Sequence, residues 1–195
     1  MRTIVIAAIL IAASTSAAPA PATAARFPGD MDRPFDGLPV PPGPRPPRPP
    51  ETEAAKAPSL ELALEAAKAV VEACKGFHVG VSVIDASGAP KLYYIADGAK
   101  GSHAYVGFRK AYTALTFRMP TSQVAALTRT DSAVAARIVA DTNLLSWAGG
   151  IPLMVGDEVI GAIGVSGAEP SAKDEECGRV GADRIKDRLK GGLAR

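Results

Sequence analysis

One stretch of the chain concentrates side chains that can bind a ligand. His103, Lys110 and Phe117 recur at intervals of seven residues, and Thr113 falls between the last two. In an α-helix this spacing places all four side chains on one face. His103 could ligate a metal centre, and Phe117 could stack on a flat ring. Arg109 or Lys110 could pair with carboxylates. The pattern therefore fits a helix face that lines a planar, anionic ligand.

A second interpretation of this helix stays open. Its neighbouring face carries Tyr105, Arg109, Tyr112 and Thr116, where a simple core helix would carry aliphatic side chains. Such a mixture of aromatic and cationic groups also suits a polar interface between subunits, or an exposed surface. Because the helix fits neither the core nor full exposure, we expect the protein to be a homo-oligomer.

The two cysteines form a candidate disulfide. Cys74 lies near the end of the first predicted helix, and Cys177 lies in the first turns of the last one. If these helices pack antiparallel on one face of a sheet, the two ends meet, and an oxidising compartment favours the bond. The alternative is two small, buried residues with free thiols. Their spacing with the two histidines shows no zinc-site pattern.

The chain divides into three parts. Residues 1–18 have the pattern of a cleavable signal peptide, with Arg2, a short apolar run, and Ser16 and Ala18 at the −3 and −1 positions. Residues 19–58 hold thirteen of the seventeen prolines and are expected to be a disordered linker. Residues 59–195 form one folded domain. We therefore expect a periplasmic or secreted protein with no stable membrane anchor after cleavage.

Periodicity predicts the elements of the domain. Ser59 is a helix N-cap before an amphipathic helix of about four turns. Alternating residues then predict two β-hairpins, at 79–95 and 151–165, that flank a helix over 102–118 and two short helical pieces over 121–141. A last helix opens at Pro170 and Ser171, with Val180, Ile185 and Leu189 expected to face inward. This order indicates an α+β domain with an antiparallel sheet.

Composition and motifs exclude several functions. The formal net charge is only +2, and no basic run indicates nucleic acid as a partner. The chain has no nucleophile elbow, phosphate loop or zinc-protease motif. His78, among valines, is expected to be a hydrogen-bonded sheet residue rather than a ligand.

Several segments together resemble the GlcG/HbpS-like haem-binding family, whose fold also occurs as the C-terminal module of PduO-type proteins. They follow one another in the order found in that family and span most of residues 59–190. The segments are VGVSVIDASG (79–88), RKAYTA (109–114), MPTS (119–122), GGIPL (149–153) and VIGAIGVSGA (159–168).

The resemblance implies a fold, a cofactor and candidate ligands. The fold is a single αββααββα domain, with helices layered on a sheet as in profilin and PAS domains. The cofactor is haem or a similar tetrapyrrole, bound by an oligomer. A threonine of the Lys-Ala-x-Thr-Ala segment, here Thr113, is an iron-ligand candidate by resemblance, whereas the chemistry of imidazole favours His103.

We therefore expect an exported, oligomeric binding protein for haem. Its candidate cofactor contacts are His103, Arg109, Lys110, Thr113 and Phe117. A haem-degrading enzyme is the first alternative, with no catalytic residue assigned. A binder of another small molecule, or a structural oligomer, is the second.

Overall fold

The computed structural model describes residues 54–191, which are built around one antiparallel sheet. Its strands are β1 (Gly80–Asp85), β2 (Pro90–Ile95), β3 (Gly150–Val155) and β4 (Glu158–Ser166). Their order in the sheet is β2-β1-β4-β3, so the two predicted hairpins join through β1 and β4. The prediction of two hairpins in one antiparallel sheet is confirmed.

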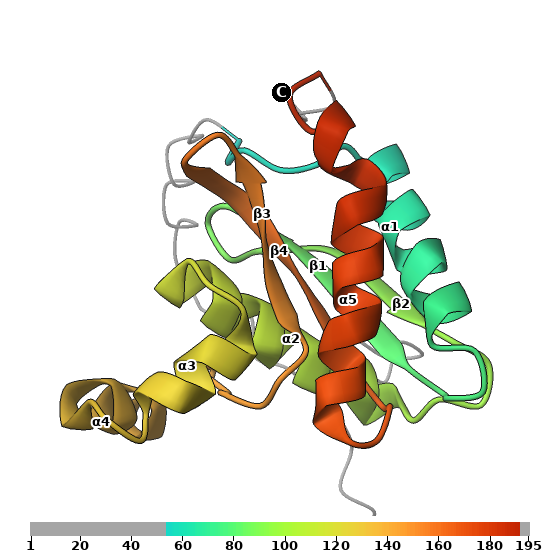
Figure 1. The fold of residues 1–195 in the computed structure, drawn as a ribbon. Helices are drawn as coiled ribbons and strands as arrows, with labels where there is room; N and C mark the ends of the chain where they lie inside the picture. Colours follow the sequence, from blue (N-terminus) through green and yellow to red (C-terminus); the bar gives the residue numbers. More distant parts are fainter. Residues whose placement is uncertain (1–53, 192–195) are drawn as a thin grey trace, which may run out of the picture. The chain divides into compact units, whose positions relative to one another are not determined.

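Helices cover both faces of this sheet (Figure 1). α1 (Leu60–Ala73) and α5 (Ser171–Ile185) lie side by side on one face, and α2 (Gly101–Phe117) crosses the other. The short helices α3 (Thr121–Leu127) and α4 (Ser132–Ala140) follow α2, and a 3₁₀ turn (Lys186–Arg188) follows α5. The α+β class and the αββααββα order, with two short helices after α2, are confirmed.

The first helix forms as its sequence predicts. Ser59 is the N-cap, and its Oγ accepts a hydrogen bond from the Leu62 amide at 3.3 Å. The apolar stripe then packs against the sheet and α5, where Ala66, Val70 and Cys74 are fully buried. This core holds α1 and α5 together on the sheet.

On the opposite face, α2 approaches the backbone of the sheet closely at Gly164. A Cβ atom added to this residue of β4 would lie 1.9 Å from the Gly107 carbonyl oxygen and 2.7 Å from the Ala111 nitrogen. Only glycine permits such a separation, because any side chain at this position would collide with the backbone of α2. The close contact fixes α2, with the side chains predicted to bind a ligand, against the sheet.

Two details differ from the sequence analysis. Residues 54–58, expected to belong to the linker, lie against the domain: Ala57 is buried, and the Lys56 carbonyl accepts a hydrogen bond from the Ala86 amide at 2.9 Å. Val180, expected to face inward, is 48% exposed, whereas Ile185 and Leu189 are buried. In this part of α5, Gly178 faces the sheet and Gly181 faces α1. The helix lies so close to both that no larger side chain would fit at these two positions.

The expected signal peptide (1–18) lies outside the described residues, as does the predicted linker up to residue 53. Both expectations remain predictions. Among residues 54–191, no helix has the length and apolar character that crossing a membrane would require.

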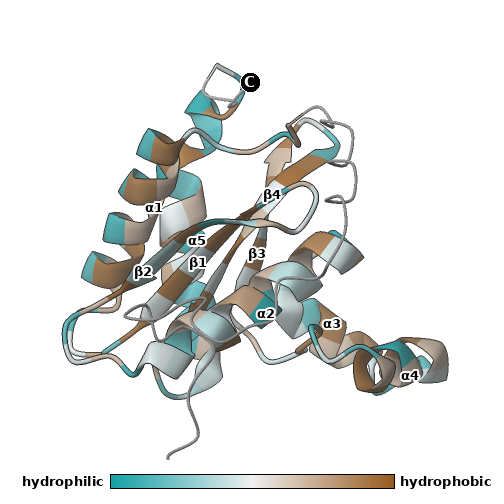
Figure 2. Ribbon diagram, turned by 180° about the vertical axis from the view of Figure 1, so that it is seen from behind, coloured by the Kyte–Doolittle hydropathy of each residue, from teal (hydrophilic) through white to brown (hydrophobic). Residues whose placement is uncertain are grey.

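The second short helix projects from the body of the domain. Asp131 caps α4 by accepting hydrogen bonds from the Ala133 and Val134 amides at 2.9 and 3.2 Å. Figure 2 shows α4 coloured largely as hydrophobic, although none of its residues is buried. One of its side chains, Arg137, folds back over the ring of Phe117 at 5.1 Å from the ring centroid. This contact links α4 to the end of α2.

The structure joins the two cysteines of the chain. Cys74 follows α1 directly, Cys177 lies in the second turn of α5, and their sulfur atoms form a disulfide with Cα atoms 5.7 Å apart. The expected antiparallel packing of α1 on α5 brings these ends together. The bond closes a loop that contains the whole sheet.

Candidate binding site

A cavity of about 640 Å³ lies at the end of the sheet where β1 begins and β4 ends. Its walls come from four places that are distant in sequence. Phe77 precedes β1, Lys100 and His103 open α2, Trp147 precedes β3, and residues 166–171 connect β4 to α5. This volume is ordinary for a small-molecule site.

His103 is oriented for ligation. Its Nδ1 lies 2.8 Å from the His78 carbonyl oxygen, so the N–H at Nδ1 is the donor. In neutral imidazole the other ring nitrogen, Nε2, then carries a free lone pair. Metal-binding histidines are commonly held in this way, by a backbone acceptor on the opposite nitrogen. Since His103 also lines the cavity, it is the best-placed metal ligand on its wall.

A glycine makes this orientation feasible. Gly167 has a φ of +122°, and a Cβ atom there would lie 2.6 Å from His103 Nδ1 and 2.4 Å from the His78 carbonyl oxygen. Any side chain at this position would displace the imidazole from its acceptor. The glycine after β4 therefore belongs to the geometry of the site.

A buried ion pair lies at the inner wall of the cavity. Lys110 and Asp174 are 1% and 2% exposed, and their Nζ and Oδ2 atoms are 2.7 Å apart. Asp174 Oδ1 also accepts the Ala168 amide at 2.8 Å. Burial lowers the pKa of Lys110 and raises the pKa of Asp174, and the contact between them opposes both shifts. The pair ties α2 to α5 through the floor of the site.

Glu175, next along α5, fixes the loop that carries Trp147. Its carboxylate is buried and accepts hydrogen bonds from the Ser122 amide at 2.9 Å, the Ser122 hydroxyl at 2.7 Å and the Arg179 guanidinium at 2.7 Å. The Gly149 amide, two residues after Trp147, donates to it at 3.4 Å. Burial alone would raise the pKa of Glu175, but the donors from Ser122 and Arg179 bring that pKa below its usual value.

Glu175 is therefore expected to make the free energy of unfolding depend on pH in the acidic range. Since its pKa is lowered by folding, its contribution is complete above the ordinary pKa of about 4.5 and disappears as pH falls through the lower folded value. Glu175→Gln should lower the free energy of unfolding by about 1.5–3 kcal/mol at pH 7. The difference from wild type should shrink as pH falls below about 4.5.

Urea unfolding at a series of pH values measures this effect. Glu176→Gln is the matched control, because that neighbouring carboxylate is exposed and contacts only Lys173 within the described chain. An equal loss for Glu175→Gln at pH 7 and pH 3 would show that the carboxylate charge is not what matters.

The structure separates the predicted ligand face into two groups. His103 and Lys110 line the cavity together. Arg109, Thr113 and Phe117 are not among its lining residues. Arg109 Nη2 donates to the Leu144 carbonyl at 2.9 Å, and the Phe117 ring is covered by a cation from α4.

Thr113 is fully buried and already has hydrogen-bond partners. Its Oγ1 donates to the Arg109 carbonyl at 2.8 Å and accepts the Leu145 amide at 2.7 Å. Ligation of a metal by Thr113 would break the second contact, which holds the loop after α4. The geometry therefore favours His103 over Thr113. His78 is hydrogen-bonded as expected, with Nδ1 2.8 Å from the Asp97 carbonyl oxygen, but it precedes β1 and is not a residue of the sheet.

Sequence reasoning missed several residues of the site. Trp147 and Phe77 flank the cavity and are 62% and 37% exposed, which is unusual for large aromatic side chains. Lys100, just before α2, adds an exposed cation to the wall. Asp174 looked like an ordinary acid in the first turn of a helix. One sequence feature could have indicated its role. Lys110 lies among small residues of α2 and would need an acidic partner if it were buried.

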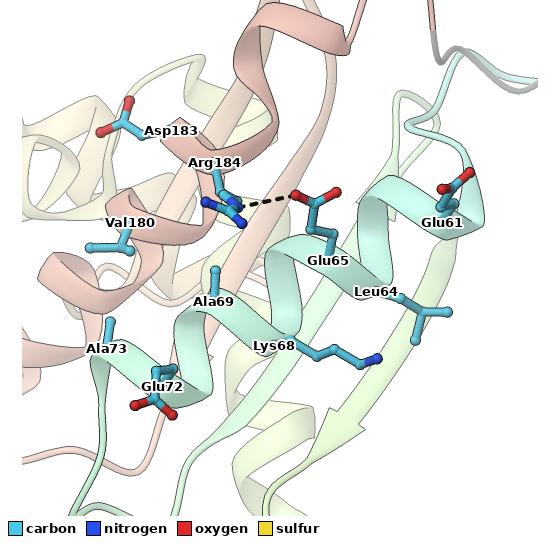
Figure 3. Close-up of a pocket in the computed structure, with 10 residues that line it drawn as sticks. All are labelled: Glu61, Leu64, Glu65, Lys68, Ala69, Glu72, Ala73, Val180, Asp183 and Arg184. Atoms are coloured by element: carbon cyan, nitrogen blue, oxygen red, sulfur yellow. Dashed lines mark hydrogen bonds and ion pairs between the residues drawn. The ribbon is translucent and has the colours of Figure 1, made fainter.

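A larger hollow lies between α1 and α5 but offers less chemistry. It measures about 1160 Å³ and is an open groove lined largely by charged, solvent-facing side chains. In Figure 3, Arg184 of α5 reaches across to Glu65 of α1, at 3.1 Å. Hydrogen bonds from Arg188 and Arg184 lower the pKa of Glu65. No histidine or aromatic ring lines this groove, so the smaller cavity is the candidate site.

Comparison with known proteins agrees with this fold. The family model for "haem degrading protein HbpS-like" matches residues 59–183. Among the curated proteins, none matches the chain. A double mutant of Streptomyces reticuli HbpS is 33% identical, and the alignment covers 72% of this chain and 95% of that one with a TM-score of 0.61.

Two more distant structures share the fold. Klebsiella pneumoniae protein ORFY is 22% identical, with a TM-score of 0.62 over 70% of this chain and 94% of that one. A PduOC:haem complex is 21% identical, with a TM-score of 0.60 over 66% of this chain and 95% of that one.

Proposed function

Because the chain belongs to the HbpS-like family, we propose that its domain binds haem in the cavity beside His103. The observation that carries this proposal is the imidazole itself, with Nδ1 anchored on a backbone carbonyl and Nε2 left free on a cavity wall. A bound haem would supply a redox-active iron. The protein would supply the axial nitrogen, the aromatic walls and the cations.

The other walls suit a flat molecule with acidic substituents. Trp147 and Phe77 offer apolar ring surface at the cavity mouth. Lys100 is exposed and free to meet a carboxylate. Lys110 gives one N–H to Asp174 and keeps two more, which can point to a second acidic group. Of the two cations predicted to pair with carboxylates, Lys110 lines the cavity and Arg109 does not, so Lys100 and Lys110 are the proposed partners of the propionates of a tetrapyrrole.

A haemin titration followed by absorbance tests the site. His103→Ala should shift the Soret band and weaken haemin binding. Loss of a residue that only orients a metal ligand costs roughly 10–100-fold in affinity, so loss of the ligand itself should cost at least as much. His78→Ala is the matched control, since it removes the second histidine of the chain but keeps the carbonyl that orients His103. Thr113→Val should keep the wild-type spectrum.

Three results would contradict the placement. They are an unchanged spectrum and affinity in His103→Ala, a loss of binding confined to His78→Ala, and a loss confined to Thr113→Val. A wild-type protein that leaves the haemin spectrum unchanged would favour a binder of another small molecule.

Haem degradation is the second candidate function, and the description of the family model favours it. Adding a reductant and oxygen to the haem-loaded protein separates the two. A stable Soret band indicates a binding protein, whereas steady loss of the band beyond that of free haem indicates an enzyme.

We also propose that the protein is exported and forms a homo-oligomer. Two exposed aromatic side chains, Tyr105 of α2 and Tyr93 of the edge strand β2, support an interface on the β2 side of the domain. The two hydroxyls are close enough for the charge of Tyr105 to add to burial in raising the pKa of Tyr93.

Light scattering at micromolar concentration should give a mass of at least a dimer. Tyr105→Glu should lower that mass, because it introduces a charge into the interface. Trp147→Glu, at an exposed aromatic position on the haem cavity, should leave the mass unchanged. A monomeric wild type would count against the oligomer.

A further inference from the structure

A separate hollow of about 420 Å³ lies at the opposite end of α2 from His103. Two arginines reach its wall, Arg118 from the end of α2 and Arg137 from α4. The hydroxyl-bearing residues Ser87, Tyr112 and Thr116 line it as well. Guanidinium groups and hydroxyls together form the usual donor set for a small oxyanion.

Both guanidinium groups are held in place by contacts that leave most of their donors free. Arg118 Nη2 donates to the Asp157 carbonyl at 2.5 Å. The Arg137 guanidinium stacks over the Phe117 ring, at 5.1 Å from its centroid. An arginine has five N–H donors, so each side chain is positioned and still able to bind.

The hollow carries uncompensated positive charge. Within residues 54–191, neither Arg118 nor Arg137 forms an ion pair with a carboxylate. Glu158 is the acid in the lining, and its carboxylate is already held by Lys56 Nζ at 2.7 Å. An anion entering the hollow would therefore meet two cations that form no ion pair within the described chain.

The backbone conformation of Arg118 also indicates that its side chain has a role. Arg118 ends α2 with φ 56° and ψ 31°, the left-handed conformation that glycine normally supplies after a helix. Residues 54–191 contain no other non-glycine residue with positive φ. A glycine would fit this backbone better, but it would remove one of the two cations.

We propose that this hollow binds a small, doubly charged oxyanion, namely inorganic phosphate or a phosphate monoester, between Arg118 and Arg137. The two guanidinium groups bind the oxygens, and the hydroxyls of Tyr112 and Thr116 complete the shell, because the Ser87 hydroxyl already donates to the Asp85 carboxylate at 2.6 Å. The site is independent of the haem proposal, because it shares no lining residue with the cavity beside His103.

Calorimetric titration of the full chain with inorganic phosphate, at constant ionic strength, tests the site. Wild type should bind one phosphate per protomer. Arg118→Gly, which suits the left-handed backbone, and Arg137→Gln should each weaken binding about tenfold or more, as expected for loss of a charge-assisted contact. Arg129→Gln, a change at an exposed arginine between α3 and α4, should bind as wild type does.

His103→Ala should also bind phosphate as wild type does, so this result does not depend on the haem site. The proposal is overturned if wild type shows no saturable binding of phosphate. It is equally overturned if Arg118→Gly and Arg137→Gln bind phosphate as tightly as Arg129→Gln.

Discussion

Replacing Lys110 with methionine is expected to lower the free energy of unfolding by about 3–5 kcal/mol. The substitution leaves the Asp174 carboxylate buried at 2% exposure, with the Ala168 amide as its remaining hydrogen-bond donor. A buried carboxylate without a cation beside it destabilises the folded protein far more than the buried ion pair does. The loss is a large part of the roughly 5–15 kcal/mol that stabilise a typical domain.

A second substitution should reverse most of this loss. The double variant Lys110→Met, Asp174→Asn keeps an acceptor for the Ala168 amide but buries no charge, so it should be clearly more stable than Lys110→Met alone. Lys100→Met is the matched control on the same cavity, and as an exposed change it should cost less than about 0.5 kcal/mol. Urea unfolding of the four proteins measures these differences.

The pH dependence separates an ion pair from simple packing. In Lys110→Met, burial raises the pKa of Asp174 and the lysine no longer opposes this shift, so stability should fall as pH rises above the ordinary value of 3.8. In Asp174→Asn, burial lowers the pKa of Lys110, so stability should rise with pH towards the ordinary value of 10.5. Two single variants whose stability follows that of wild type at every pH would contradict the ion-pair interpretation.

Local patterns were sufficient to predict most of the fold. The N-cap at Ser59 and the two alternating hairpins are each encoded within a few residues, and the structure places elements where they indicate. The errors arose where tertiary contacts decide. Val180 fits an apolar stripe, but α5 turns its glycines inward because the gap to the sheet and α1 is narrow.

The candidate site was harder to predict, because its residues converge from distant parts of the chain. Helical spacing correctly grouped His103 with Lys110, since both lie on one face of one helix. The same spacing also included Thr113 and Phe117, which lie further along α2 and face a loop and α4 instead. Nothing local to Trp147 or Asp174 indicates that they line the same cavity as His103, because the cavity depends on how two loops and α5 pack on the sheet.

Loss of the Cys74–Cys177 bond is the other large effect that we expect. The two residues are 103 positions apart, and the chain-entropy model assigns about 4–5 kcal/mol to closing a loop of this length in the unfolded chain. Cys74→Ala with Cys177→Ala should therefore lower the free energy of unfolding by up to this amount. Because both residues are buried in the core between α1, α5 and the sheet, part of the loss would come from packing.

Oxidised and reduced wild type separate these two contributions, since they contain the same side chains and differ only in the bond. The reduced protein should unfold at a clearly lower urea concentration, and the double alanine variant should not respond to reductant at all. Export would supply the oxidising compartment in which the bond forms. Two free thiols in the denatured, unreduced protein would show that the cysteines are merely neighbours in the core, and an unchanged urea midpoint on reduction would show that the cross-link contributes little to stability.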